Sequence, residues 1–141
     1  MKKISKYISY LEATTSQTAT RNKIDNTPTE LELLNMQLVA IRVFDVVRTH
    51  FAKPMRVSSF FRSLALNKAV GGSKTSQHVK GQAIDIQGTN GLTNKQIFDY
   101  IKDNLDFDQL IWEFGTKSNP AWVHVSYVSK EKNRKQVLYI K

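Results

Sequence analysis

The sequence predicts an α+β fold in which helices pack on a small antiparallel sheet. Two segments, residues 29–50 and 93–104, open on helix-capping patterns and continue with apolar residues at helical spacing. Shorter apolar segments, several alternating with polar residues, fill much of the remaining chain and end at turn residues, which is typical of β-strands. Such helices and strands bury their apolar sides against one another.

Composition limits the class of protein. The chain has 141 residues, 40% hydrophobic and 23% charged, so we expect a single domain over residues 1–141. It has no cysteine, which excludes disulfides, thiol catalysis and cysteine-bound zinc. No apolar run reaches membrane-spanning length, and the residues after Met1-Lys2-Lys3 are too polar for a signal peptide. The net charge of +9 favours acidic partners, but without an arginine-rich arm we expect no nucleic acid.

The first half of the chain begins with a polar arm, residues 1–28, expected as a short helix or turn and then an extended stretch. A helix over residues 29–50 follows, with Thr29 and Glu32 as its capping box. Its expected core face consists of Leu31, Leu34, Leu38, Ile41 and Val46. His50 falls at the C-terminal end, where a cationic side chain suits the helix dipole, so we assign it a structural role.

The remaining elements are shorter. Residues 55–60 are expected as a strand and 64–70 as a short helix, closed by Gly71-Gly72 and a flexible loop. Residues 93–104 form the second helix, with Ile97, Ile101 and Leu105 on one face. Further strands are expected at residues 83–87, 109–114, 121–128 and 136–140.

Three side chains are candidates for a metal site: His78, Asp85 and His124. In a strand alternate residues face the same way, so His124 shares a face with Trp122 and Ser126 while the valines between them face the core. Two imidazoles and a carboxylate, with a water in the fourth position, form an open zinc site. A lone strand histidine is commonly structural, but here two apolar strands each carry one ligand-type residue and a glycine-rich loop delivers the third.

The same residues carry a resemblance to a known family. The pattern is Ser76-x-His78-x-x-Gly81-x-Ala83-x-Asp85 followed by Trp122-x-His124-x-Ser126. It resembles the zinc D-Ala-D-Ala carboxypeptidases of peptidase family M15, which include phage endolysins and are structurally akin to the hedgehog signalling domain. Similarity extends over nearly the whole chain, including Val57–Ser63, Leu66–Gly72 and Asp108–Glu113. The resemblance implies a hedgehog/DD-peptidase-like fold and one Zn²⁺ ion held by His78, Asp85 and His124.

The catalytic base does not transfer directly from the family. Many members carry an acidic residue three positions before the last histidine, where this chain has Ala121. We expect Glu113 to replace it, because it ends the preceding strand on one face with Gln109 and Ile111 and hedgehog-like relatives place their glutamate on that neighbouring strand. The alternative is that Glu113 only borders an exposed loop.

Several polar or aromatic residues are candidates for substrate contact. The family match indicates that Arg62 binds a substrate carboxylate or a developing oxyanion, the alternative being a surface ion pair. Ser76 and Gln77 are expected to hydrogen-bond substrate or to support His78. Trp122 is expected to line the cleft or to pack, and Ser126 to steady the site.

Function follows from the resemblance. It implies hydrolysis of D-Ala-containing peptide bonds of peptidoglycan stem peptides, by a carboxypeptidase or an endopeptidase. We expect a monomer without membrane insertion, made in the cytoplasm, phage- or prophage-encoded, and acting on the cell wall. Two alternatives stay open. One is an inactive hedgehog-like wall-binding module, which Ala121 favours, and the other is a non-haem iron oxygenase, whose His and carboxylate are usually closer in sequence.

Overall fold

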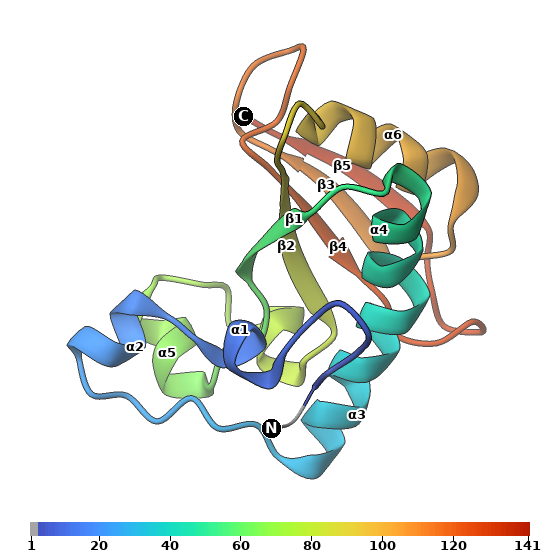
Figure 1. Ribbon diagram of the computed structural model, residues 1–141. Coiled ribbons are helices and arrows are strands. Elements are labelled where there is room, and N and C mark those ends of the chain that lie inside the picture. Colours follow the sequence, from blue (N-terminus) through green and yellow to red (C-terminus); the bar gives the residue numbers. More distant parts are fainter. Residues whose placement is uncertain (1–2) are drawn as a thin grey trace.

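The computed structural model describes residues 3–141 and shows helices packed against a five-stranded sheet (Figure 1). The spatial order of the strands is β1-β2-β4-β3-β5. Their bounds are Met55–Ser59 for β1, Ala83–Gly88 for β2, Gln109–Glu113 for β3, Trp122–Ser126 for β4 and Gln136–Ile140 for β5. The expected α+β class is confirmed, and residues 1 and 2 of the expected N-terminal arm lie outside the described residues.

The sheet is mixed rather than wholly antiparallel. Three neighbouring pairs are antiparallel, but β5 runs parallel to β3, with Gln109 opposite Gln136 and Glu113 opposite Ile140. The expectation of an antiparallel sheet assumed that successive strands pair as hairpins. After β4 the chain instead passes β3 and adds β5 to its outer side, so β5 has the direction of β3.

The longest helical segment consists of α3 (Glu30–Val39), a π-helical turn η1 (Ala40–Phe44) and α4 (Asp45–Phe51). The expected capping box is present: Thr29 accepts a hydrogen bond from the backbone N–H of Glu32, whose side chain accepts one from the N–H of Thr29. The helix therefore begins where its sequence predicts.

The buried face of this segment differs from the expected one. Leu31, Leu34 and Ile41 are 68%, 62% and 54% exposed, so their assignment to the core is wrong. The side chains that are buried are Met36, Val39, Ala40, Val43, Phe44 and Val47. They recur at intervals of three and four and form a more regular helical stripe than the leucines do. The small Ala40 on this stripe leaves room for close packing against the rest of the core.

The N-terminal arm contains two short helices, α1 (Tyr10–Thr14) and α2 (Gln17–Arg21), which lie with α5 (Leu64–Ala69) at one end of the molecule (Figure 1). The arm is hydrogen-bonded to the segment that follows β1. The backbone N–H of Phe61 donates to Ala13 O, and Asn26 donates to Phe61 O and accepts from the N–H of Ser63.

One face of the sheet is covered by the long helical segment and by α6 (Asn94–Asn104) (Figure 1). Helix α6 begins with the expected capping box of Thr93 and Gln96, and its Ile97 and Ile101 are fully buried. The strand residues that meet these helices are the aliphatic ones, among them Ile84, Ile86, Leu110, Val123 and Val125. Residues that alternate with them point to the other face of the sheet, where the polar candidates lie. No helix within residues 3–141 has both the length and the apolar character needed to cross a membrane.

His50 lies at the C-terminal end of α4, as expected. Its ring stacks on Tyr100, with 4.0 Å between ring centroids, and meets the edge of Phe51. His50 thus packs against two aromatic rings, in agreement with its structural assignment.

Candidate metal centre

His78 is carried by a short 3-10 helix, η2 (Gln77–Lys80), which the sequence reasoning treated as loop. The hydroxyl of Ser76 accepts a hydrogen bond from the backbone N–H of His78 at 3.2 Å and so caps this turn. Gly81 ends the turn in the left-handed region, with φ of +74°. A Cβ at Gly81 would lie 2.6 Å from the carbonyl oxygen of Glu32, so glycine is also needed for the close approach to α3.

The imidazole of His78 is 2% exposed and held in one tautomer. Its Nδ1 lies 2.7 Å from the carbonyl oxygen of Phe60, which can only accept, so Nδ1 carries the hydrogen. The other ring nitrogen, Nε2, is therefore an acceptor. It is buried and has no hydrogen-bond partner among the described residues. A lone pair left without a partner in the interior is costly unless another group binds it.

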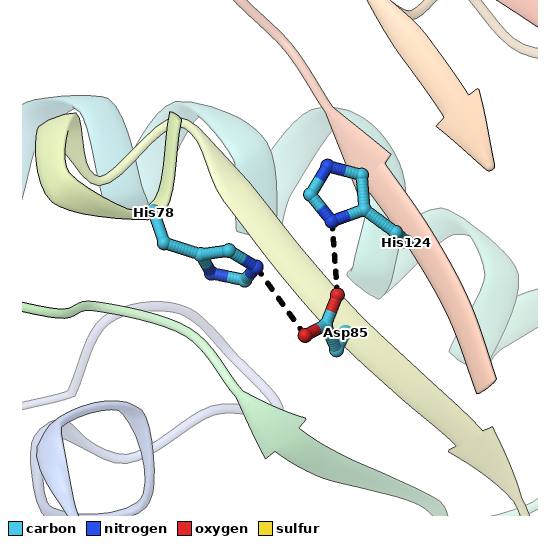
Figure 2. A group of neighbouring side chains, drawn as sticks. All are labelled: His78, Asp85 and His124. Atoms are coloured by element: carbon cyan, nitrogen blue, oxygen red, sulfur yellow. Dashed lines mark hydrogen bonds and ion pairs between the residues drawn. The ribbon is translucent and has the colours of Figure 1, made fainter. Parts of the chain in front are cut away.

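Asp85 and His124 face each other from neighbouring strands, β2 and β4, where they are paired in register. The Asp85 carboxylate lies between the two imidazoles (Figure 2). Its Oδ1 is 3.0 Å from Nδ1 of His124, and its Oδ2 is 3.3 Å from Nε2 of His78. An irregularity of pairing in β1 lies beside Asp85, and the hydroxyl of Ser58 donates to the Asp85 carbonyl there.

The charge state of Asp85 follows from these neighbours. Burial by itself would raise the pKa of the carboxyl, because it penalises the charged form. The two imidazoles that face the carboxylate, those of His78 and His124, act in the opposite direction and prevail. The pKa of Asp85 is therefore held below its usual range, and the group is an anion at neutral pH.

The three residues meet the requirements of a metal site. One ligand-type atom from each of His78, Asp85 and His124 lies within 4.8 Å of the other two. The unpaired Nε2 of His78 points toward the group, and its opposite nitrogen is anchored to a backbone carbonyl, as is usual for metal-binding histidines. Two neutral imidazole nitrogens and one carboxylate suit a divalent transition metal such as zinc. Within the described residues His50 is not part of this group.

Arg62 lies beside the three residues and is not an ordinary surface ion pair. Its side chain is 19% exposed, and its Nη2 is 3.8 Å from Oδ2 of Asp85. The buried Asn67 accepts a hydrogen bond from Nη1, and Ser59 accepts one from Nε. The guanidinium is thus held in a fixed orientation at the edge of the candidate metal site.

A cleft of about 810 Å³ opens over the site, and His78, Asp85 and His124 all line it. Glu113 and Trp122 line the same cleft from the β3–β4 pair, where they stand opposite each other. The indole Nε1 of Trp122 donates to Oε2 of Glu113 at 2.7 Å, and its ring packs on Phe114. Glu113 therefore lies in the cleft with His124, as alternation along the strand predicts.

The remaining candidates occupy different environments. Ser76 and Gln77 border the cleft, but the hydroxyl of Ser76 caps η2 and the Gln77 amide donates to Oδ2 of Asp108. Ser126 is fully buried, and its hydroxyl accepts from the backbone N–H of Gln109. Ser126 thus braces β3 against β4 and does not face the cleft, so its expected contact with substrate does not fit this placement.

Sequence reasoning missed Asp108 and Arg134. Asp108 is 2% exposed and binds Gln77, the neighbour of His78, while Arg134 borders the cleft. The only available signal was an acidic residue directly before an apolar strand and an arginine within a basic stretch. Neither pattern indicates that the two residues meet.

Comparison with protein families identifies the chain. A model of peptidase M15 matches residues 6–126 of the 141. The chain belongs to the peptidase M15 family. The matched part of this M15 chain contains all three candidate metal ligands and ends at the last residue of β4. No curated protein matches the chain.

Membership makes this M15 chain a peptidase of the metallopeptidase type. Its His-Asp-His group can bind a metal ion, which agrees with that class. The resemblance stated from the sequence is thereby confirmed at the level of the family. Ala121 stands where many M15 members carry an acid, and in the structure its carbonyl accepts from Asn94 and Gln87.

Proposed function

We propose that the protein is a zinc metallopeptidase that hydrolyses D-Ala-containing peptide bonds of bacterial peptidoglycan. One observation supports it above the others. In a chain of a peptidase family, the buried Nε2 of His78 lacks a partner and faces Asp85 and His124 at the base of an open cleft. No other described group of His, Asp or Glu side chains converges in this way.

The three residues would hold one zinc ion, and their donors match its preference for nitrogen and oxygen ligands. Bound zinc supplies Lewis-acid polarisation of the scissile carbonyl and a water of lowered pKa. The chain contributes the fixed tautomer of His78 and the anionic Asp85, so the ligand atoms are preorganised.

Glu113 is the proposed general base and acid. Its carboxylate accepts the proton of the attacking water and returns it to the leaving amine. Trp122 fixes the carboxylate through Oε2, and the shared cleft keeps it on the same side of the sheet as His124. Glu113 thus replaces the acidic residue that the family resemblance implies at position 121, where this chain has alanine.

Arg62 is the proposed stabiliser of the oxyanion that develops on the scissile carbonyl. Its guanidinium is already oriented by Asn67 and Ser59 and lies next to Asp85. A preorganised donor of this kind stabilises charge that appears only in the transition state.

We infer a wall-directed role for the whole molecule. The net charge of +9 attracts the anionic polymers of a bacterial envelope, which supports peptidoglycan as the partner. The proposal includes a monomer, encoded by a phage or prophage and acting on the wall, without membrane insertion or nucleic-acid binding.

The second candidate is a wall-binding module that has lost catalysis. Ala121 favours it, because this residue has no carboxylate at the position, three residues before His124, where the family resemblance implies an acid. This alternative predicts zinc binding and wall binding without release of any product.

The test is incubation of zinc-loaded protein with purified peptidoglycan, followed by mass analysis. Free D-Ala identifies a carboxypeptidase, and released muropeptides identify an endopeptidase. Glu113→Gln should lower turnover by about 10²- to 10⁴-fold, the usual contribution of a general base, while zinc content stays unchanged. Glu131→Gln, at an exposed position outside the cleft, is the matched control.

Absence of cleavage by the unmodified protein on every wall type would favour the binding module. Full activity of Glu113→Gln would remove Glu113 from the mechanism but leave the metal site standing.

A further inference from the structure

A second charged cluster, formed by Asp108, Arg134 and Gln77, lies at the border of the cleft. Asp108 is buried directly before β3 and accepts four hydrogen bonds. Its Oδ1 receives the backbone N–H and the Nε–H of Arg134, both at 3.0 Å. Its Oδ2 receives Nη2 of Arg134 and Nε2 of Gln77, both at 2.8 Å. The carboxylate thus ties the segment before β5 to the turn that carries His78.

This arrangement fixes the guanidinium of Arg134 and leaves some of its N–H donors free for a ligand. The bidentate contact with Asp108 uses two of the five N–H donors that a guanidinium carries. The Arg134 side chain is 57% exposed and borders the cleft, so its outer edge faces solvent at the mouth. A fixed, partly exposed guanidinium is well suited to bind a planar carboxylate through paired hydrogen bonds.

The charges around the cleft point to an anionic ligand group. Arg62, Lys80 and Arg134 are its cations, and Asp85 and Glu113 are its anions. Both anions are already engaged, Asp85 by the imidazoles and Glu113 by Trp122. Arg62 lies against Asp85 beside the metal site, whereas Arg134 is held by a separate carboxylate. A bound peptide therefore meets two separately held cations, one beside the candidate metal site and one held by Asp108 at the border of the cleft.

We propose that Arg134, positioned by Asp108, binds a free carboxylate of the peptide substrate away from the scissile bond. The inference rests on the proposed peptidase function and specifies its substrate class as peptides with such a carboxylate. Arg134 lies outside residues 6–126, the part matched by the family, so the subsite belongs to this chain's own C-terminal segment. Arg134 is the binding residue, and Asp108 acts through it as a positioning residue.

The ligand group has two possible sources, the terminal carboxylate and an acidic side chain within the peptide. Three synthetic stem peptides distinguish them: one ending in free D-Ala-D-Ala, its C-terminal amide, and one with only the acidic side chain amidated. Loss of affinity on amidation identifies the group that Arg134 binds. Charge-assisted hydrogen bonds of this kind correspond to a preference of about 10- to 100-fold.

Binding is measured first, by calorimetry on the zinc-loaded full chain, because it does not require turnover. We expect the peptide with both carboxylates to bind more tightly than one of the amidated peptides. Arg134→Gln should remove that preference and leave affinity for the same amidated peptide unchanged. Arg134→Lys should retain part of it as a point charge, and Lys132→Gln, at an exposed neighbouring position, should retain all of it.

Hydrolysis of the same peptides then separates positioning from general damage. Asp108→Asn should raise KM for the preferred peptide by a larger factor than KM for the amidated peptide. A merely structural role would affect both peptides alike. Equal binding of all three peptides by the unmodified chain, or an intact preference in Arg134→Gln, would overturn the inference. Preferential binding without any hydrolysis would uphold the subsite and count against the proposed peptidase activity.

Discussion

At the scale of single residues, the candidate metal site depends on how one imidazole is held. The hydrogen bond from Nδ1 of His78 to Phe60 O decides which nitrogen keeps a lone pair, and burial prevents water from satisfying it. Asp85 lies close enough to both imidazoles to remain charged in the interior. The lone pair of His78 and the negative charge of Asp85 are therefore already in position to bind a cation.

Removal of one candidate ligand should abolish tight metal binding. We expect about one zinc per chain in the purified protein, and His78→Ala should weaken zinc affinity by at least about 100-fold, because loss of a ligand exceeds the 10- to 100-fold cost of losing a supporting residue. Competition with a chromophoric chelator measures this affinity. His50→Ala is the control, since His50 stacks on Tyr100 away from the site.

Metal analysis of the same preparations provides the contradicting outcome. Iron in place of zinc in freshly purified protein would support the oxygenase alternative. Unchanged zinc affinity in His78→Ala would show that these residues do not form the site.

At the scale of elements, the turn that carries His78 depends on its contact with α3. Gly81 packs against the carbonyl oxygen of Glu32 and the side chain of Met36. A Cβ at this position would collide with both groups. The first turn of α3 and the turn that carries His78 therefore position each other.

Gly81→Ala should destabilise the protein more than Gly71→Ala. Both glycines have φ near +75°, so both variants pay about 1–2 kcal/mol for the left-handed backbone. Only at Gly81 does a Cβ meet other atoms, whereas at Gly71 it meets none within 4 Å. Urea denaturation measures the difference, and equal losses in the two variants would contradict the proposed contact.

Local rules predicted the elements that depend on local sequence. Both capping boxes, the strands and the face of the β4 histidine follow from short-range patterns and are found as predicted. Convergence of His78 with Asp85 and His124 was expected mainly from the family resemblance, because alternation fixes the face of each strand residue but not which strands pair.

Features that depend on distant contacts were not predictable. Leu31 and Leu34 fit a helical stripe, but the sheet packs against the stripe that contains Ala40. The parallel placement of β5 depends on the path after β4, and no local signal sets that path. The pairing of Asp108 with Arg134 follows from this placement, so it could not be found before the fold.

At the scale of the whole molecule, stability should decrease in acid. The hydrogen bonds from Arg134 hold the pKa of Asp108 at about 2, below the value of about 3.9 for an unperturbed aspartate. A lowered folded-state pKa means that the stabilisation is complete above pH ~4 and is lost as pH falls toward ~2. The lowered pKa of Asp85 acts in the same direction.

Asp108→Asn isolates one part of this dependence. The free energy of unfolding should be lower in the variant at pH 7, and the difference from the unmodified protein should shrink between pH ~4 and ~2. Urea titrations followed by tryptophan fluorescence at several pH values measure the difference. Asp85 is common to both proteins, so its contribution cancels. A difference that stays constant down to pH ~2 would show that the charge of Asp108 does not matter.

The N-terminal arm has a consequence that reaches beyond its own residues. Ala13 and Asn26 fasten the backbone of Phe61, and the adjoining carbonyl of Phe60 is the group that orients His78. The contacts of the N-terminal arm are thus one peptide unit away from the carbonyl that orients the His78 imidazole. Proteolytic removal of the arm would therefore loosen the orientation of His78 without removing any of the three candidate metal ligands.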